Sequence, residues 1–233
     1  MMLEALGAGV AALGAAAHGA FHRNSPVFGR PITKVIGRSP AVALTFDDGP
    51  NPDATPLILD ALRERRVHAT FFILGSHAER WPTLVRRVAD EGHTIGNHGY
   101  FHRKLHFKSP AYVRRDLELG TQAIVKACGV RPSLFRAPHG FRSPWVTAIA
   151  RSLGQRTVGW SLGVWDSDRP GVEVIAQRTI DGARSGSILL LHDGDGYDPR
   201  GDRVQTARAV PLIVDRLLAQ GYRFDRLDHL DAA

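Results

Sequence analysis

Short apolar stretches alternate with amphipathic stretches along most of the chain. The apolar stretches suited to strands are residues 41–46, 69–74, 94–97, 133–136, 156–161, 187–192 and 222–226. Between them, apolar side chains recur at helical spacing, as at Leu57, Ile58, Ala61 and Leu62. Strands that alternate with amphipathic helices predict a parallel sheet or barrel and not a β-sandwich.

Prolines and glycines mark where these helices are expected to begin and end. Thr55, Ser109 and Ser143 each precede a proline, which predicts a capping hydroxyl followed by proline in the first helical turn. Glycines are expected to close helices at Gly92, Gly129, Gly154, Gly186 and Gly221.

The length of the chain fits one catalytic domain. Its 233 residues are 43% hydrophobic, enough for one sizeable core. We assign residues 41–227 to this domain, residues 1–40 to an N-terminal apolar segment and linker, and residues 228–233 to a C-terminal tail.

The N-terminal segment carries an Ala/Gly-rich apolar stretch at residues 3–20. Small residues near its end resemble those before a signal cleavage site, whereas Glu4 and the lack of a preceding Lys or Arg do not. We expect export or membrane anchoring, with the domain facing the cell wall, over a cytoplasmic location. The alternative is a soluble N-terminal helix.

Charge and cysteine content narrow the classes of partner. The formal net charge of +7 can attract anionic polymers, but no basic motif is interleaved with aromatic residues, so nucleic acid is not expected as a partner. Cys128 is the only cysteine, which excludes an intramolecular disulfide and a cysteine-based metal site. The sequence does not predict the oligomeric state.

Polar side chains gather at the carboxyl ends of the predicted strands. They are Asp47, Asp48, His98, His102, Arg136, Asp166 and His192. Because α/β barrels build their active sites at this end, we expect these residues to lie close together.

A metal site is predicted within this group. His98 and His102 are four residues apart, and one helical turn would direct both imidazoles to one side. Asp47 and Asp48 follow an apolar strand, where buried carboxylates need a nearby cation. Two histidines and one carboxylate form an open, hydrolytic type of zinc site, leaving the second carboxylate free as a base. The alternatives are incidental loop histidines and aspartates that only cap a loop.

Four motifs resemble one known family in their order along the chain. They are TFDDGP at residues 45–50, HGYFH at 98–102, RAPHG at 136–140 and LLLH at 189–192. The chain resembles, over roughly residues 40–227, the polysaccharide deacetylases with a NodB homology domain, also called carbohydrate esterase family 4. The resemblance implies a distorted (β/α)7 barrel, and the seven predicted strands agree with it.

The resemblance also implies roles for individual residues. Asp47 would be the general base, paired with Arg136, and His192 the general acid, oriented by Asp166. Asp48, His98 and His102 would bind the metal. The backbone N–H of His139 would help to stabilise the oxyanion, and Trp160, Trp165 and Leu190 would wall the acetyl pocket. For these last three side chains, ordinary core packing is the alternative.

The activity implied is a metal-dependent hydrolase that removes N-acetyl groups from an amino-sugar polymer or oligomer of the chitooligosaccharide or peptidoglycan type. An acetylated carbohydrate is therefore the expected partner. One divalent metal is expected, with Zn²⁺ favoured over Co²⁺, Ni²⁺ or Mn²⁺. The alternatives are an acetyl xylan O-deacetylase and an inactive carbohydrate-binding barrel.

The chain departs from the family pattern at Gly99, Ser167 and His139. Gly99 replaces a Ser or Thr and would remove a hydroxyl that stabilises the loop, while the other two would alter the groove floor. The remaining histidines, interpreted as surface or packing residues, are His68, His77, His93, His106 and His229.

Overall fold

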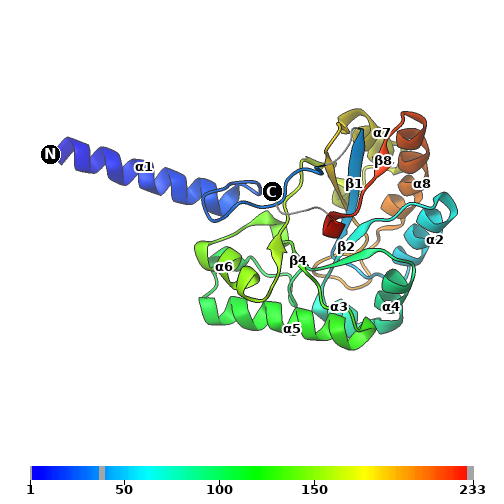
Figure 1. The fold of residues 1–233 in the computed structure, drawn as a ribbon, viewed down its shortest axis with the longest axis horizontal. Helices are drawn as coiled ribbons and strands as arrows, with labels where there is room; N and C mark the ends of the chain where they lie inside the picture. The colour runs from blue at the N-terminus through cyan, green and yellow to red at the C-terminus, as the bar shows by residue number, and fades with distance from the viewer. Residues whose placement is uncertain (1, 37–39, 230–233) are drawn as a thin grey trace.

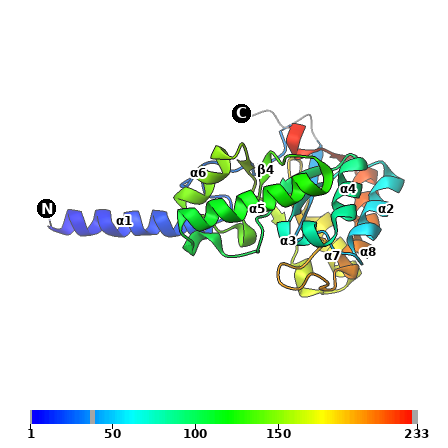
Figure 2. The same cartoon turned by 90° about the horizontal axis from the view of Figure 1, so that it is seen from below.

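The computed structural model describes residues 2–36 and 40–229. Helix α1 (Met2–Phe21) projects from the rest of the molecule (Figures 1 and 2), and the side chains of residues 9–18 are all exposed. None of the helices in the described ranges is both long enough and apolar enough to cross a membrane. The expectation of export or anchoring stays a prediction.

A parallel sheet forms the centre of the molecule. Its strands are β1 (Ala41–Asp47), β2 (Thr70–Ile73), β3 (Thr94–Asn97), β4 (Leu134–Phe135), β5 (Arg156–Thr157), β6 (Leu162–Gly163), β7 (Ile188–His192) and β8 (Arg223–Phe224). Seven of them follow the order β5-β4-β3-β2-β1-β7-β6, while β8 pairs with β1 outside this path. Every described pairing is parallel, and the expected distorted barrel is confirmed.

Two of the expected strands differ from the structure. The stretch 156–161 forms only the two residues of β5, and β6 follows as a separate, unexpected strand. The last expected strand, at residues 222–226, shortens to β8, which pairs with Ala41 and Val42 at the start of β1. Strand β2 pairs with Thr45 to Asp47 at the other end of β1, so β2 and β8 pair with different parts of the same strand.

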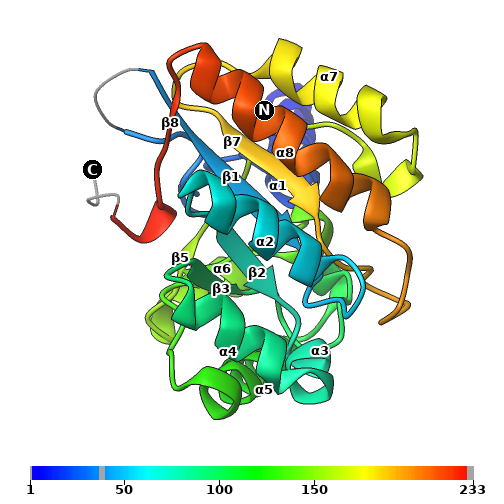
Figure 3. The same ribbon diagram turned by 90° about the vertical axis from the view of Figure 1, so that its right-hand side faces the viewer.

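Helices surround the sheet (Figure 3). They are α2 (Thr55–Arg65), α3 (Gly75–Arg80), α4 (Pro82–Asp90), α5 (Pro110–Cys128), α6 (Pro144–Ser152), α7 (Val172–Gly182) and α8 (Val204–Ala219). The main core lies between them and the sheet, with Phe46, Phe71 and Leu191 buried at its centre. In α2 the buried face includes Leu59, while Leu57 is exposed, because the helix is rotated slightly from the expected face.

The helix ends agree only in part with the sequence analysis. Ser109 caps α5 by accepting the Tyr112 N–H, as expected. Thr55 is the first residue of α2 and does not cap it. Its hydroxyl instead donates to the Asp193 carboxylate at 2.6 Å, a contact with a distant part of the chain. Ser143 stands at the start of α6 without a side-chain capping bond.

Among the glycines, Gly129 closes α5 in the left-handed conformation, as expected. The expectation for Gly186 is wrong. Helix α7 already ends at Gly182, where the Ala183 backbone turns extended, and Gly186 lies in the turn that leads into β7.

Candidate active site

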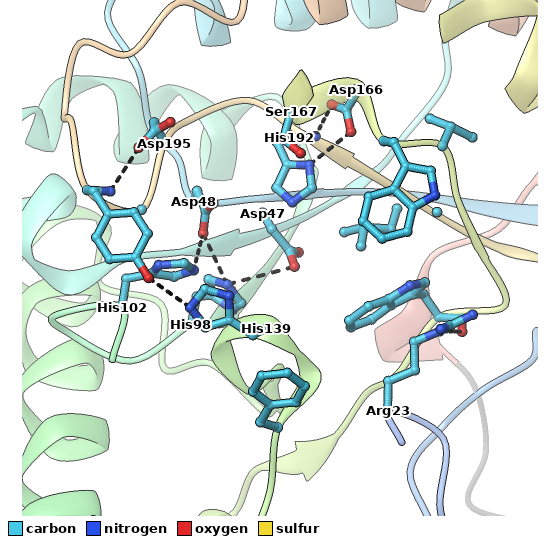
Figure 4. Close-up of a pocket in the computed structure, with 18 of the residues that line it drawn as sticks. Arg23, Asp47, Asp48, His98, His102, His139, Asp166, Ser167, His192 and Asp195 are labelled. Atoms are coloured by element: carbon cyan, nitrogen blue, oxygen red, sulfur yellow. Dashed lines mark hydrogen bonds and ion pairs between the residues drawn. The ribbon is translucent and has the colours of Figure 1, made fainter. Parts of the chain in front are cut away.

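A cavity of about 700 Å³ opens at the carboxyl ends of β1, β3, β6 and β7. Its lining includes Asp47, Asp48, His98, His102, His139, Asp166 and His192, which Figure 4 shows around one space. Arg136 lies behind them, fully buried. The structure thus brings together all seven polar residues that the sequence places at strand ends.

Asp48 and the two histidines form the tightest group in the cavity. The Asp48 Oδ1 atom lies 3.2 Å from His98 Nε2 and 3.1 Å from His102 Nε2. All three side chains are buried. Burial raises the pKa of the Asp48 carboxyl, but His102 and His98 together outweigh burial and hold that pKa well below its usual range. The carboxylate is therefore ionised.

The donor set fits a divalent metal. Asp48 Oδ1 is buried without a hydrogen-bond partner, and its ligand atom and those of His98 and His102 lie within 4.8 Å of one another. His98 Nδ1 lies 2.8 Å from the Arg136 carbonyl oxygen. Because a carbonyl only accepts, Nδ1 carries a proton, and Nε2 is the ring nitrogen left to bind a metal. Two imidazoles and one carboxylate leave further coordination positions open.

The two histidines do not lie on a helical turn, which corrects the expected geometry. They bound a loop in which Gly99 (φ 80°) and His102 (φ 53°) adopt left-handed backbone conformations. The buried Asp116 carboxylate of α5 holds this loop by accepting the Tyr100 N–H at 3.1 Å and the Phe101 N–H at 3.2 Å. Convergence of the imidazoles therefore depends on α5.

Asp116 also explains the glycine at position 99. A Cβ there would lie 2.5 Å from Asp116 Oδ2, and the left-handed backbone would strain any larger residue. The carboxylate thus occupies the place where a Ser or Thr hydroxyl was expected to stabilise the loop. Loss of the hydroxyl is offset by two hydrogen bonds from a different element.

Asp47 faces the cavity beside this group and pairs with a buried cation. Its Oδ1 accepts from Arg136 Nη1 at 2.7 Å, and its Oδ2 lies 3.8 Å from His98 Nε2. The guanidinium is held by Thr45 Oγ1 and the Gly159 carbonyl, and it stacks 4.1 Å from the Phe72 ring centre. Arg136 therefore fixes the orientation of the Asp47 carboxylate.

His192 and Asp166 form a second ion pair across the cavity. Asp166 Oδ1 lies 2.9 Å from His192 Nδ1, while Oδ2 accepts the His192 backbone N–H and the Thr206 hydroxyl. Burial alone lowers the pKa of His192, but Asp166 outweighs it and raises that pKa to about 9. The imidazole is cationic at neutral pH, and its side chain is 20% exposed, so Nε2 can donate a proton into the cavity.

His139 contributes a neutral ring. Its Nε2 lies 3.0 Å from the Tyr197 hydroxyl, and its ring centre is 4.6 Å from that of His102. Burial, followed by the charge of His102, lowers the pKa of His139 to about 4. Asp48, His102, His139 and Trp165 all have positive φ, so four of the six non-glycine residues with that backbone, among those described, lie at this site.

The three residues expected to wall the acetyl pocket all line the cavity. Trp160 is partly buried, Leu190 is 7% exposed and Trp165 is 72% exposed. Trp165 therefore cannot be an ordinary core residue. Ser167, one of the departures from the family pattern, lines the cavity too.

Several cavity residues have no counterpart in the sequence prediction. Asp195, Tyr197 and Arg203 follow β7, with Arg203 donating to Asp195 at 2.7 Å and the Tyr197 ring 5.3 Å from that of His102. The acidic, glycine-rich stretch that follows His192 could have indicated a loop at the site. Phe21, His22 and Arg23, from the N-terminal segment, also line the cavity, and no sequence motif indicated them.

Two of the histidines interpreted as surface or packing residues have polar roles. His77 Nδ1 hydrogen-bonds the Asp48 carbonyl at 2.8 Å and so holds the strained backbone of that residue. His93 is buried, and its Nδ1 accepts the Ala69 N–H at 3.2 Å. His106 is buried, in agreement with a packing role. The side chain of His229 lies outside the described residues.

Comparisons with known proteins agree with this geometry. A family model described as polysaccharide deacetylase matches residues 34–158. The chain is 40% identical over 194 residues to a peptidoglycan-N-acetylglucosamine deacetylase of Bacillus cereus, covering 81% of this chain and 87% of that protein. It is 38% identical over 199 residues to a chitooligosaccharide deacetylase of Bradyrhizobium, covering 82% and 90%.

A solved structure is similar to this chain over most of its length. The family 4 carbohydrate esterase of Streptomyces lividans, solved in complex with acetate, matches with a TM-score of 0.74 and 30% identity. The match covers 81% of this chain and 93% of that one. The sequence matches, the fold and the order of the site residues lead to one conclusion: the chain belongs to the polysaccharide deacetylase family.

Proposed function

We propose that this protein is a metal-dependent deacetylase that removes N-acetyl groups from an amino-sugar polymer or oligomer. The observation that carries the proposal is the convergence of two separate devices on one cavity. One is the Asp48, His98 and His102 set, and the other is the His192 and Asp166 pair. Relatives named as deacetylases of peptidoglycan and of chitooligosaccharides support this class of substrate.

Asp48, His98 and His102 would hold a divalent metal, which when bound would act as a Lewis acid on the acetyl carbonyl and lower the pKa of water. Zn²⁺ is the ion we propose, because two nitrogens, one carboxylate and open positions suit it. Asp47 takes the proton of the attacking water. Arg136 donates to that carboxylate at 2.7 Å and so holds it in place beside the cavity.

His192 completes the reaction from the other side of the cavity. As the carbon–nitrogen bond of the tetrahedral intermediate breaks, the imidazolium gives its Nε2 proton to the departing amine nitrogen. Asp166 holds the other ring nitrogen, so Nε2 is the one directed to substrate. The His139 backbone N–H is proposed to donate to the developing oxyanion. Trp160 and Leu190 form the walls against which the acetyl methyl packs.

An acetyl xylan O-deacetylase is the second candidate, because the same centre can attack an ester. Relatives named as N-acetylglucosamine and chitooligosaccharide deacetylases favour the amide. His192 is also held where it can protonate a departing amine, a step that an amide needs far more than an ester does. An inactive carbohydrate-binding barrel is disfavoured, because the base, the acid and the three donor residues are all in place.

Acetate release tests the proposal. The purified protein, loaded with Zn²⁺, is incubated with N-acetylglucosamine oligomers, peptidoglycan fragments and acetylated xylan. We expect acetate from the N-acetylated glycans and little from xylan. Release from xylan alone would transfer the function to the O-deacetylase, and no release from any substrate would refute the proposal.

A further inference from the structure

The end of α1 and the stretch that follows it form part of the cavity wall, and none of the proposed catalytic roles uses them. Phe21, His22 and Arg23 line the same cavity as Asp48 and His192. Figure 4 shows Arg23 at the opposite side of the cavity from His102. The segment lies outside residues 34–158, which the family model matches.

A buried arginine anchors this segment to the barrel. Arg142 is 1% exposed, and its guanidinium donates to the Ser25 carbonyl at 2.7 Å and to the Gly29 carbonyl at 3.3 Å. Its backbone N–H donates to the Ala20 carbonyl at 3.1 Å. Leaving a buried guanidinium unpaired is costly, so these bonds fix the course of the segment on both sides of Arg23.

Two glycines make room for Arg23 and its neighbour. Arg23 Nε and Asn24 Nδ2 both donate to the Trp160 carbonyl, at 3.2 and 2.9 Å. A Cβ on Gly140 would lie 2.9 Å from the Arg23 Cβ, and one on Gly159 would overlap the Asn24 side chain. The segment therefore packs closely against the barrel at these two glycines, and this packing holds Arg23 beside the cavity.

Arg23 carries a side-chain charge that no described residue of this lining neutralises. The other charged groups have partners: Asp47 lies beside Arg136, Asp48 beside His98 and His102, Asp166 beside His192, and Asp195 beside Arg203. The described part of the chain offers Arg23 no ion pair, and its two terminal nitrogens make no hydrogen bond there, because only Nε is used. Two N–H groups of a planar guanidinium match the two oxygens of a carboxylate.

We infer that Arg23 binds a carboxylate on a sugar next to the N-acetyl sugar that reacts. The inference rests on the proposed function and narrows its substrate class. It favours an amino-sugar glycan with free carboxyl groups, such as peptidoglycan strands whose muramic acid carries no peptide, over a neutral glycan of the chitin type. The cavity volume of about 700 Å³ is within the range for drug-sized ligands. The net charge of +7 adds long-range attraction for an acidic polymer.

The test compares one glycan in two charge states. An N-acetylglucosamine oligomer that contains muramic acid is used as the free carboxylate and after conversion of its carboxyl groups to methyl amides. Acetate release gives kcat/KM for each form, and calorimetry gives the affinity of each form independently of turnover. The parent should prefer the carboxylate, and added salt should weaken this preference because Arg23 is partly exposed.

Arg23→Gln should reduce the ratio of carboxylate to amide kcat/KM about tenfold, mainly through KM, as expected for one charge-assisted contact. Arg23→Lys should keep part of the preference, since the charge remains while the planar fork is lost. Arg86→Gln, an exposed arginine on α4 outside the cavity lining, is the matched control and should leave the ratio unchanged.

The outcomes separate the two proposals. If the parent binds and cleaves both forms equally, or Arg23→Gln leaves both ratios unchanged, the role of Arg23 is refuted while the deacetylase function stands. If no acetate is released from either form, the proposed function fails. The affinity ratio from calorimetry then still supports or overturns the carboxylate contact.

Discussion

Asp116 offers the sharpest test of how the metal site is built, because it touches the loop between two proposed ligands without contributing one. Its carboxylate accepts the N–H groups of Tyr100 and Phe101, which lie between His98 and His102. Asp116→Ala removes both acceptors and leaves the α5 backbone in place. We expect the protein to fold but to bind Zn²⁺ more weakly.

The structure sets the size of the effect. A fully buried N–H left without a partner costs about 1–3 kcal/mol, but Phe101 is 47% exposed and Tyr100 is partly buried, so water can replace part of each bond. We therefore take a loss of about 1 kcal/mol in binding free energy for each of the two hydrogen bonds. The sum agrees with the tenfold to hundredfold loss of metal affinity that is typical when groups supporting a metal ligand are removed. We therefore predict a 10- to 100-fold rise in the Zn²⁺ Kd, roughly 1.4–2.7 kcal/mol.

Competition with a chromophoric chelator measures this Kd, and circular dichroism checks that the variants are folded. Asp116→Asn should fall between the parent and Asp116→Ala, because the amide oxygen can accept one N–H while its NH2 group faces the other. Glu118→Gln, which changes a partly exposed residue on the same helix, is the control. A Kd for folded Asp116→Ala within twofold of the parent would refute the reasoning.

Three further predictions concern the proposed chemistry. Asp47→Asn should retain Zn²⁺ while losing most acetate release, because it removes the base and leaves the three donors; parent-like turnover at full metal content would contradict this role. His192→Ala should slow amide hydrolysis about a hundredfold to ten-thousandfold, and an activated aryl ester much less; equal losses with metal content matched would point to a positioning role. Asp166 raises the pKa of His192 to about 9, so Asp166→Asn should lower that pKa. The protonated acid is then lost at lower pH, and the basic limb of kcat/KM should move downward; a limb that stays in place would exclude His192 as its source.

The sequence by itself determined the fold class and most of the groups proposed to be catalytic. Strand and helix periodicity is local, so residues 41–46 and 94–97 were predicted close to their observed bounds. Asp47, His98, Arg136 and His192 stand at the ends of strands. Parallel pairing brings such ends to one edge, so their convergence followed from their place at the carboxyl ends of the strands.

Tertiary structure decided how these groups are held. The spacing of His98 and His102 suggested a helical turn, whereas the observed loop depends on Asp116, which lies in α5. His77 was assigned to packing because nothing near it in the sequence shows its bond to the Asp48 carbonyl. Such contacts join residues far apart along the chain, and only the packing of complete elements fixes them.

The cavity wall supplied by the N-terminal segment shows the same limit most clearly. Arg23 precedes every motif, and its neighbours in the sequence give no sign of a binding role. Its place beside Trp160 depends on Arg142, Gly140 and Gly159, all more than a hundred residues away. Local patterns therefore determined which residues can carry out the chemistry, and long-range packing decided which others surround the substrate.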